Sequence, residues 1–341
     1  MREGGAYMRG LLKGENIGVQ NHLAVINIGG FDDQQTRLWN VKDLRPAVSY
    51  QLNGADAGET YFNGFIFSPI SSRDGSYIHP LYDGFGERSI EQDWQLYLNY
   101  LFEKETNLHA LESLASTKLD IWIGLPYPLI GDTIFGTAGT GVDMAFDSTA
   151  TRLTALSWWY KQFVTKWHAT GFTKLKLQGF YWIKEVLSES DEELIQQINN
   201  QIHADGYKTM WLPNYGGFGA MKPWKGDHLK FDVTAVNTNY YGNTMMGTEW
   251  INHACMFSNV FGCGLQLNIG KGWTFSPYHV YDFLNFGLPT RNNYINDHLL
   301  VFSFYNLTFK EFAESSPAEY QQIRHFMKKQ YVDQSYPGRA Y

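Results

Sequence analysis

One glutamate follows three aromatic residues at the end of a strand-like run in the middle of the chain. The run Leu175–Ile183 is mostly apolar, and Phe180, Tyr181 and Trp182 lie just before Glu185. Packing of a buried strand explains the aromatic residues but gives no reason for the acid. Apolar surroundings disfavour the charged form of a glutamate and raise its pKa, so such a side chain can hold a proton at neutral pH. Glu185 is therefore our candidate general acid or base.

A surface role is the alternative for Glu185. The acidic stretch Glu189–Glu193 follows shortly after it, and negative charge is favourable at a helix N-terminus. We assign that structural role to the acids of the stretch itself. For Glu185 we favour chemistry, because active sites of parallel barrels form where strands end and the next loops begin.

Several other kinds of site have no signature in the sequence. None of the ten histidines forms His-x-His or His-x-x-x-His, so we expect no metal site. A phosphate loop and a Gly-x-Ser-x-Gly elbow are missing, and the glycine-rich segment 136–141 lacks the strand-to-helix context of a dinucleotide site. Neither Cys255 nor Cys263 has an evident histidine partner. We expect no cofactor, which leaves carboxylate chemistry or binding.

The composition points to a carbohydrate partner rather than nucleic acid. The net charge is −7, without a basic stripe that could follow phosphates. Aromatic residues make up 16% of the chain, and Tyr and Trp offer flat apolar faces with a polar edge that suit sugar rings. An aromatic-rich core is the alternative explanation of this composition.

The sequence predicts no membrane span and leaves the compartment open. No window holds 18 uninterrupted apolar residues. Two cysteines do not make a disulfide framework. The first residues lack the apolar run of a signal peptide. The protein is thus either intracellular, or secreted or cell-surface with its signal absent from this chain; its oligomeric state is undetermined.

Eight strand-like runs predict an α/β fold, a single (β/α)₈ barrel. Helical patterns separate several of them, at residues 91–114 and 152–170 and after the capping boxes that begin at Ser190 and Ser316. An open doubly wound sheet is the main alternative. We expect one domain over residues 1–341, with its core at about 22–335. The runs are Leu23–Gly30, Phe62–Ile70, Leu119–Pro128, Leu175–Ile183, Tyr207–Asn214, Val233–Tyr241, Gly262–Ile269 and Leu299–Asn306.

Six segments of the chain recur, in the same order, in a known protein family. They are Phe62–Phe67, Gly124–Pro128, Leu156–Tyr160, Gly179–Glu185, Trp211–Tyr215 and Asn239–Tyr241. On these segments the chain resembles the bacterial family called domain of unknown function 4855. The resemblance implies a barrel similar to glycoside hydrolases, many of which carry an acid/base glutamate after strand four and a nucleophile on strand seven. Glu185 matches the first of these positions.

Strand seven departs from the family pattern. Where the family has Gly-Val-Glu-Ile-Glu, this chain has Gln266 and Asn268 in place of both acids. The family's Phe-Asp-Gly on strand two becomes Phe-Asn63-Gly, and its Gln-Pro-Asn on strand six becomes Asn-Thr-Asn239. An amide can hydrogen-bond a hydroxyl but is a very poor nucleophile and no carboxylate base. The predicted site keeps its shape and loses charge.

Other acids near predicted strand ends could supply the second carboxylate of a hydrolase, although each is more commonly a loop residue. They are Asp32, Asp33, Asp74, Asp132 and Glu249.

Two functions follow, and whether the chain is an enzyme stays open between them. One is a glycoside hydrolase-like enzyme on an oligo- or polysaccharide, with Glu185 as general acid/base and an unidentified partner. The alternative is a barrel that binds carbohydrate without cleaving it; a third interpretation is a scaffold with a decayed site. The predicted substrate-binding side chains are Tyr181, Trp182, Tyr215, Asn239, Tyr240, Tyr241, Gln266, Asn268 and Asn63.

Overall fold

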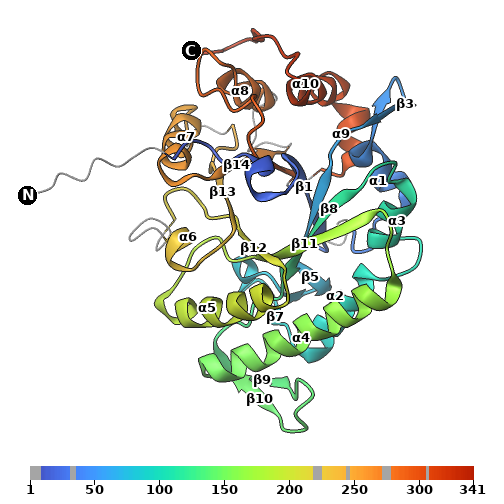
Figure 1. Ribbon diagram of the computed structural model, residues 1–341, viewed down its shortest axis with the longest axis vertical. Coiled ribbons are helices and arrows are strands. Elements are labelled where there is room, and N and C mark those ends of the chain that lie inside the picture. The colour runs from blue at the N-terminus through green and yellow to red at the C-terminus, as the bar shows by residue number, and fades with distance from the viewer. Residues whose placement is uncertain (1–8, 31–35, 218–224, 243–245, 271–277, 305–306) are drawn as a thin grey trace, which may run out of the picture. The chain divides into compact units, whose positions relative to one another are not determined.

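The structure is a computed structural model that describes residues 9–30, 36–217, 225–242, 246–270, 278–304 and 307–341 (Figure 1). Eight parallel strands form a closed barrel in the order β1-β15-β14-β13-β12-β11-β8-β4. Seven of the strands lie within one predicted run each, and β1 begins one residue before its run, so the barrel prediction is confirmed and the open sheet is excluded. The strands are β1 His22–Ile28, β4 Gly64–Pro69, β8 Leu119–Leu125, β11 Leu175–Trp182, β12 Lys208–Trp211, β13 Val233–Asn237, β14 Gly264–Ile269 and β15 Leu300–Phe304.

Helices and small sheets fill the connections between the barrel strands. The helices are α1 Val41–Val48, α2 Glu91–Leu101, α3 Asn107–Leu114, α4 Thr149–Thr170, α5 Glu189–Ala204, α6 Lys225–His228, α7 Glu249–Phe261, α8 His279–Phe286, α9 Phe309–Ser315 and α10 Pro317–Met327. The short strands are β2 Ser49–Leu52, β3 Ala55–Thr60, β5 Ser71–Arg73, β6 Ser76–Tyr77, β7 Glu87–Arg88, β9 Gly131–Gly136 and β10 Met144–Phe146. Across the described helices, no segment is both long and apolar enough to cross a membrane.

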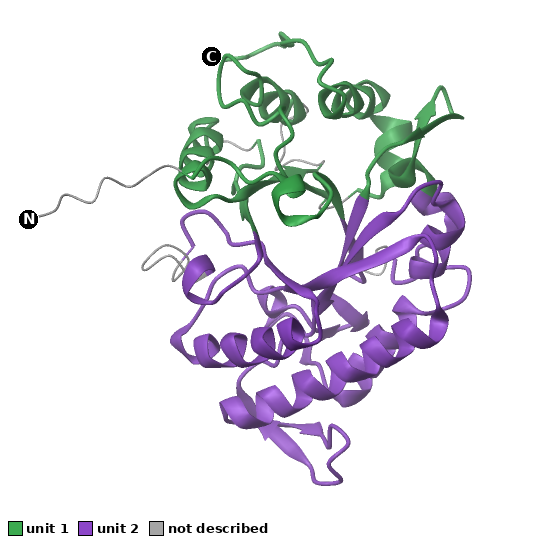
Figure 2. Cartoon of the chain, viewed as in Figure 1, with its two compact units in different colours: residues 1–24, 45–63, 234–341 green, residues 25–44, 64–233 purple. Residues whose placement is uncertain are grey.

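The chain divides into two compact units (Figure 2). Unit 1 comprises residues 1–24, 45–63 and 234–341, and unit 2 comprises residues 25–44 and 64–233. Unit 2 carries four consecutive barrel strands, β4, β8, β11 and β12, and unit 1 carries β14 and β15 with most of β13. Each unit is described by itself below.

The packing of β11 in unit 2 decides which of its side chains face inward. The ring of Phe180 packs edge-on against Tyr160 and Phe163 of α4, with centroids 4.8 and 5.5 Å away. Phe180 therefore faces the helices, and because side chains alternate along a strand, Tyr181 faces the barrel interior. In Figure 1, α4 runs beside α5, and the two helices are in contact.

Close backbone approach explains the glycine that interrupts the apolar residues of β11. A Cβ atom on Gly179 would lie 1.8 Å from the carbonyl oxygen of Lys208 on β12. The pairing of β11 with β8 also shifts by one residue between Leu177 and Gly179. Glycine at this position lets the two strands pair, as expected for a glycine inside a strand.

Two helix predictions are corrected by side-chain hydrogen bonds. The predicted helix 91–114 breaks into α2 and α3, because Asn107 adopts φ 44° and its amide donates to the carbonyl of Tyr100, 2.7 Å away. The helix α5 begins at Glu189 with Ser188 as its cap, two residues before the predicted Ser190. The Asp191 carboxylate accepts the backbone N–H of Ser188 at 3.3 Å. The start of α10, with Ser316 before Pro317, agrees with the sequence.

Candidate functional site

Glu185 lies three residues beyond the end of β11, the fourth barrel strand along the chain, and is half-buried. Asn214, which follows β12, holds it at two points. The backbone N–H of Asn214 donates to the carbonyl of Glu185 at 3.1 Å, and its side-chain amide donates to Glu185 Oε2 at 3.1 Å. Backbone and carboxylate of Glu185 are thus fixed by a single residue of the neighbouring strand's loop.

The two residues before Glu185 are fixed in the same way. His79 donates a hydrogen bond to the backbone carbonyl of Ile183, and the indole of Trp211 donates to the carbonyl of Lys184 at 2.9 Å. Three successive carbonyls after β11 therefore each accept from a different neighbour. Loops that carry functional groups need such supports to hold a side chain in one orientation.

Two tyrosines lie near the Glu185 carboxylate. Burial raises the pKa of Tyr181 well above its usual value, and the negative charge of Glu185 raises it further. The pKa of Tyr82 is raised by the same two causes, again with burial first. Both hydroxyls therefore stay protonated at neutral pH and can donate hydrogen bonds. A carboxylate beside two neutral phenols is suited to polar ligands rich in hydroxyls.

A buried ion cluster lies behind the loop that carries Glu185. The Asp191 carboxylate, fully buried in α5, accepts from Arg152 Nη2 at 2.7 Å and from Lys184 Nζ at 2.7 Å. The Tyr127 hydroxyl donates to the same carboxylate at 2.9 Å. Burial alone would raise the pKa of Asp191, but the hydrogen bonds from Arg152 and Lys184 hold that pKa below its usual value. The cluster ties Lys184, the residue before Glu185, to α4 and α5.

In unit 1, two amide side chains of β14, the seventh barrel strand along the chain, are hydrogen-bonded to each other. Gln266 Nε2 donates to Asn268 Oδ1 at 3.0 Å, and Asn268 Nδ2 donates to Asn237 Oδ1 at 2.7 Å. All three side chains are buried. Gln266 Oε1 and Thr238 Oγ1 are buried without a hydrogen-bond partner among the described residues. Buried polar atoms of that kind usually find water or a ligand.

The predicted sugar platforms are mostly buried. Trp182 is 2% exposed, with its ring edge against Tyr127, and Tyr181 is 4% exposed. Tyr240 is also 4% exposed, and its hydroxyl donates to Asp282. Faces that are covered by protein cannot stack on a sugar ring.

The remaining predicted residues fall into two groups. Tyr215, Tyr241 and Asn239 are half-buried, and Asn239 has φ 54° with its N–H bonded to the side chain of Asn237 at 2.9 Å. Asn63 precedes the first residue of β4, at the amino end of the strand, where its side-chain oxygen accepts from His22 N at 3.2 Å. Since barrel sites form at carboxyl ends of strands, we leave Asn63 out of the site.

Three of the acids considered as a second carboxylate are exposed to solvent. Asp74 is exposed and pairs with Arg37 at 2.9 Å. Asp132 is exposed on β9, and Glu249 is exposed as the first residue of α7. Asp32 and Asp33 lie outside the described residues. Among described residues, no group of three or more metal-ligating side chains is close enough to hold an ion.

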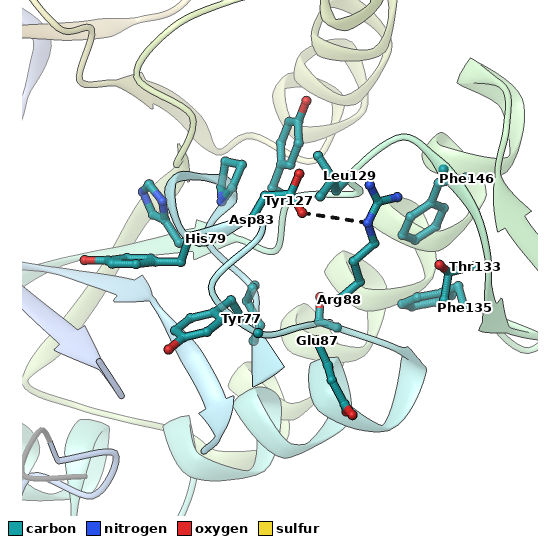
Figure 3. Close-up of a pocket in the computed structure, with 16 residues that line it drawn as sticks. Tyr77, His79, Asp83, Glu87, Arg88, Tyr127, Leu129, Thr133, Phe135 and Phe146 are labelled. Atoms are coloured by element: carbon teal, nitrogen blue, oxygen red, sulfur yellow. Dashed lines mark ion pairs between the residues drawn. The ribbon is translucent and has the colours of Figure 1, made fainter. Parts of the chain in front are cut away.

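Sequence reasoning missed a pocket in unit 2 whose lining includes Tyr82, a neighbour of Glu185 (Figure 3). Tyr77 and Tyr82 are stacked there with centroids 5.3 Å apart, and Phe85 is 65% exposed. The signal was present in the run Tyr82-Asp-Gly-Phe-Gly86, which puts aromatic residues in a glycine-containing loop after strand two.

A family model and several solved structures match this chain. The family model of the domain of unknown function DUF4855 matches residues 23–329. A broad-specificity endoglucanase from an uncultured bacterium is 10% identical, covering 93% of this chain and 97% of its own, with a TM-score of 0.47. A candidate chitinase A from Streptomyces coelicolor is 8% identical, with coverage of 91% and 99% and a TM-score of 0.47. The tamarind chitinase-like lectin is 15% identical, with coverage of 91% and 98% and a TM-score of 0.38. No curated protein sequence matches.

Proposed function

The chain belongs to the DUF4855 family, and we propose that this member is a glycoside hydrolase-like barrel that binds an oligo- or polysaccharide through a site centred on Glu185. The observation that carries the proposal is the fixation of Glu185 at the end of β11, by Asn214 at its carbonyl and its carboxylate. The two tyrosines beside it, Tyr82 and Tyr181, keep their protons.

Binding is better supported than rapid cleavage. Glycoside hydrolysis needs one group to protonate the leaving oxygen and a second carboxylate to activate water or stabilise charge. Glu185 suits the first role. At the strand-seven positions where the family resemblance places acids, the buried amides Gln266 and Asn268 bond to each other instead. An amide cannot replace a carboxylate in either role, so we expect slow hydrolysis or none.

Hydrolysis is the second candidate, and the rigid support of the Glu185 loop favours it. A group that only binds a ligand tolerates some freedom, whereas a proton donor must be held within a fraction of an ångström of its acceptor. In that case another acid acts as the partner of Glu185, and an inverting mechanism with its wider carboxylate spacing makes such a replacement easier.

Titration of the protein with a panel of oligosaccharides tests the proposal. The variant Glu185→Gln keeps the side-chain shape and an oxygen for the Asn214 amide, but loses the charge. A hydrogen bond to a charged group contributes about 1.5–3 kcal/mol, so affinity should fall roughly 10- to 150-fold. Glu189→Gln, at an exposed position at the start of α5, is the matched control and should bind like the wild type.

Two further measurements separate the outcomes. Thermal unfolding of Glu185→Gln should stay close to that of the wild type, and release of reducing ends should be slow or undetectable in both. A variant that loses stability while its glycan affinity is unchanged would assign Glu185 a structural role. Rapid cleavage by the wild type would favour the enzyme over the binding protein.

A further inference from the structure

A pocket that is partly open to solvent lies within unit 2, and Tyr82 is one of its lining residues. One wall comes from residues 77–89, in the connection that follows β4, and the other from residues 127–135, in the connection that follows β8. The barrel order places β4, β8 and β11 next to one another. The pocket is therefore built by the connection after β8, which is the neighbour of β11, and by the connection after β4, the next strand along.

One face of β9 forms part of the second wall. Gly131, Thr133 and Phe135 line the pocket, whereas Asp132 and Ile134 between them do not. This is the alternation of a β-strand, in which successive side chains point to opposite faces. Ile134 is 55% exposed on the other face. Neighbouring residues of β9 thus point into the pocket and away from it, so a substitution and its control can be placed on the same strand.

The first wall presents aromatic surface. Tyr77 and Tyr82 stack with 23° between their planes, and Tyr82 packs edge-on against His79 at 6.0 Å. Beside them, Leu81 and Phe85 are each 65% exposed. Exposed aromatic and apolar groups next to tyrosine side chains fit the C–H faces and hydroxyl edges of a sugar ring.

The charged groups of the pocket disfavour an acidic ligand. Asp83, Glu87 and Arg88 line it, which leaves one net negative charge (Figure 3). Arg88 pairs with Asp83 at 3.8 Å and donates to the carbonyl of Ile130 at 2.9 Å, so it links the two walls. A Cβ atom on Gly131 would lie 1.8 Å from Arg88 Nη1, so a larger residue there would displace the guanidinium from this position.

We propose that this pocket is a second sugar subsite, which takes a neutral or amino sugar unit of the chain whose neighbouring units contact Glu185. The inference rests on the proposed function and makes it more specific. The ligand is an oligosaccharide with units on both sides of Tyr82, and uronic acid polymers are excluded. Affinity should therefore rise with chain length.

Substitution of the inward-facing residue of β9 tests the subsite. Thr133 is exposed at the pocket, and its side chain makes no hydrogen bond to the described residues, so Thr133→Trp should fill the pocket without unfolding the protein. Ile134→Trp adds the same ring to the opposite face of the strand without changing the charge and is the control. Calorimetry would compare dimers and hexamers of cellulose, chitin and chitosan, together with a galacturonic acid hexamer.

In the wild type, a hexamer should bind at least about fivefold more tightly than its dimer, since one stacked ring contributes on the order of 1 kcal/mol. Thr133→Trp should abolish that difference and leave dimer affinity unchanged, while Ile134→Trp should match the wild type. Equal hexamer affinity in Thr133→Trp and the wild type would overturn the subsite alone, as would preferential binding of the galacturonate. Loss of binding in Thr133→Trp but not in Glu185→Gln would refute the role of Glu185 and leave the subsite. A wild type that binds none of these probes would overturn both.

Discussion

Asp191→Asn should destabilise the protein strongly, because it removes the only carboxylate described in the cluster behind the Glu185 loop. Asp191 is fully buried and accepts from Arg152 and Lys184, each at 2.7 Å. The Arg152 side chain is 1% exposed, so it cannot turn to solvent when its partner is lost. Removing one member of a buried ion pair typically costs about 3–5 kcal/mol. We expect a loss in that range from urea unfolding at pH 7.

A double-variant cycle identifies the source of the loss. Lys184→Met removes the second cation, which is 18% exposed, and should cost less than Asp191→Asn. The double variant should lose less stability than the two single variants added together, because Lys184→Met removes one of the cations that Asp191→Asn leaves unpaired. A loss below about 1 kcal/mol for Asp191→Asn, or strict additivity, would refute the reasoning.

The same cluster makes a prediction about pH. The pKa of Asp191 is lowered in the folded protein, so its contribution is present above the unfolded pKa of about 4 and is lost as the pH falls through the folded pKa. The stability difference between the wild type and Asp191→Asn should therefore shrink as the pH falls below about 4. If the stability difference between the wild type and Asp191→Asn stays constant below pH 4, the ion-pair explanation is wrong.

Two other predictions concern His79 and strand seven. Burial lowers the pKa of His79 to about 4, so the unfolded chain takes up a proton at this residue at a higher pH than the folded protein does. The free energy of unfolding should therefore decrease as the pH falls from about 6.5 to about 4. Burial lowers the pKa of His22 in the same way. In His79→Gln, the decrease in the free energy of unfolding between about pH 6.5 and 4 should be about 3 kcal/mol smaller than in the wild type. Equal decreases in the variant and the wild type would disprove this role of His79. Gln266→Glu restores an acid where the family resemblance has one, so it should release reducing ends from a glycan that the wild type binds but does not cleave. Gln266→Leu serves as the control, and a Gln266→Glu variant without turnover would show that strand seven does not limit catalysis.

Much of the fold could be predicted because periodicity and residue type act locally. The eight apolar runs coincide with the eight barrel strands, and Gly179 and Gly264 lie inside strands as expected. The position of Glu185 after β11 also follows from the sequence, since a residue just past a strand must lie at that strand's carboxyl end. These inferences need only the order of residues along one element.

Tertiary structure decided which aromatic side chains are exposed and which polar groups meet. Trp182 is covered because Tyr127, held by Asp191 and Arg152, lies against its ring. The exposed aromatic surface lies instead around Tyr82, in an irregular connection with no periodic pattern to reveal it.

The hydrogen bonds that position Glu185 come from residues far away in the sequence. His79 and Asn214 are separated from it by long stretches of chain, and the sequence contains nothing that announces their contact. The Asn107 amide, which lies at the break in a predicted helix, likewise donates to the carbonyl of Arg37, 70 residues earlier in the chain. Local pattern determines where a strand or helix forms. Which side chains are buried or brought together depends on the packing of elements against one another, and that packing decided the surroundings of the candidate site.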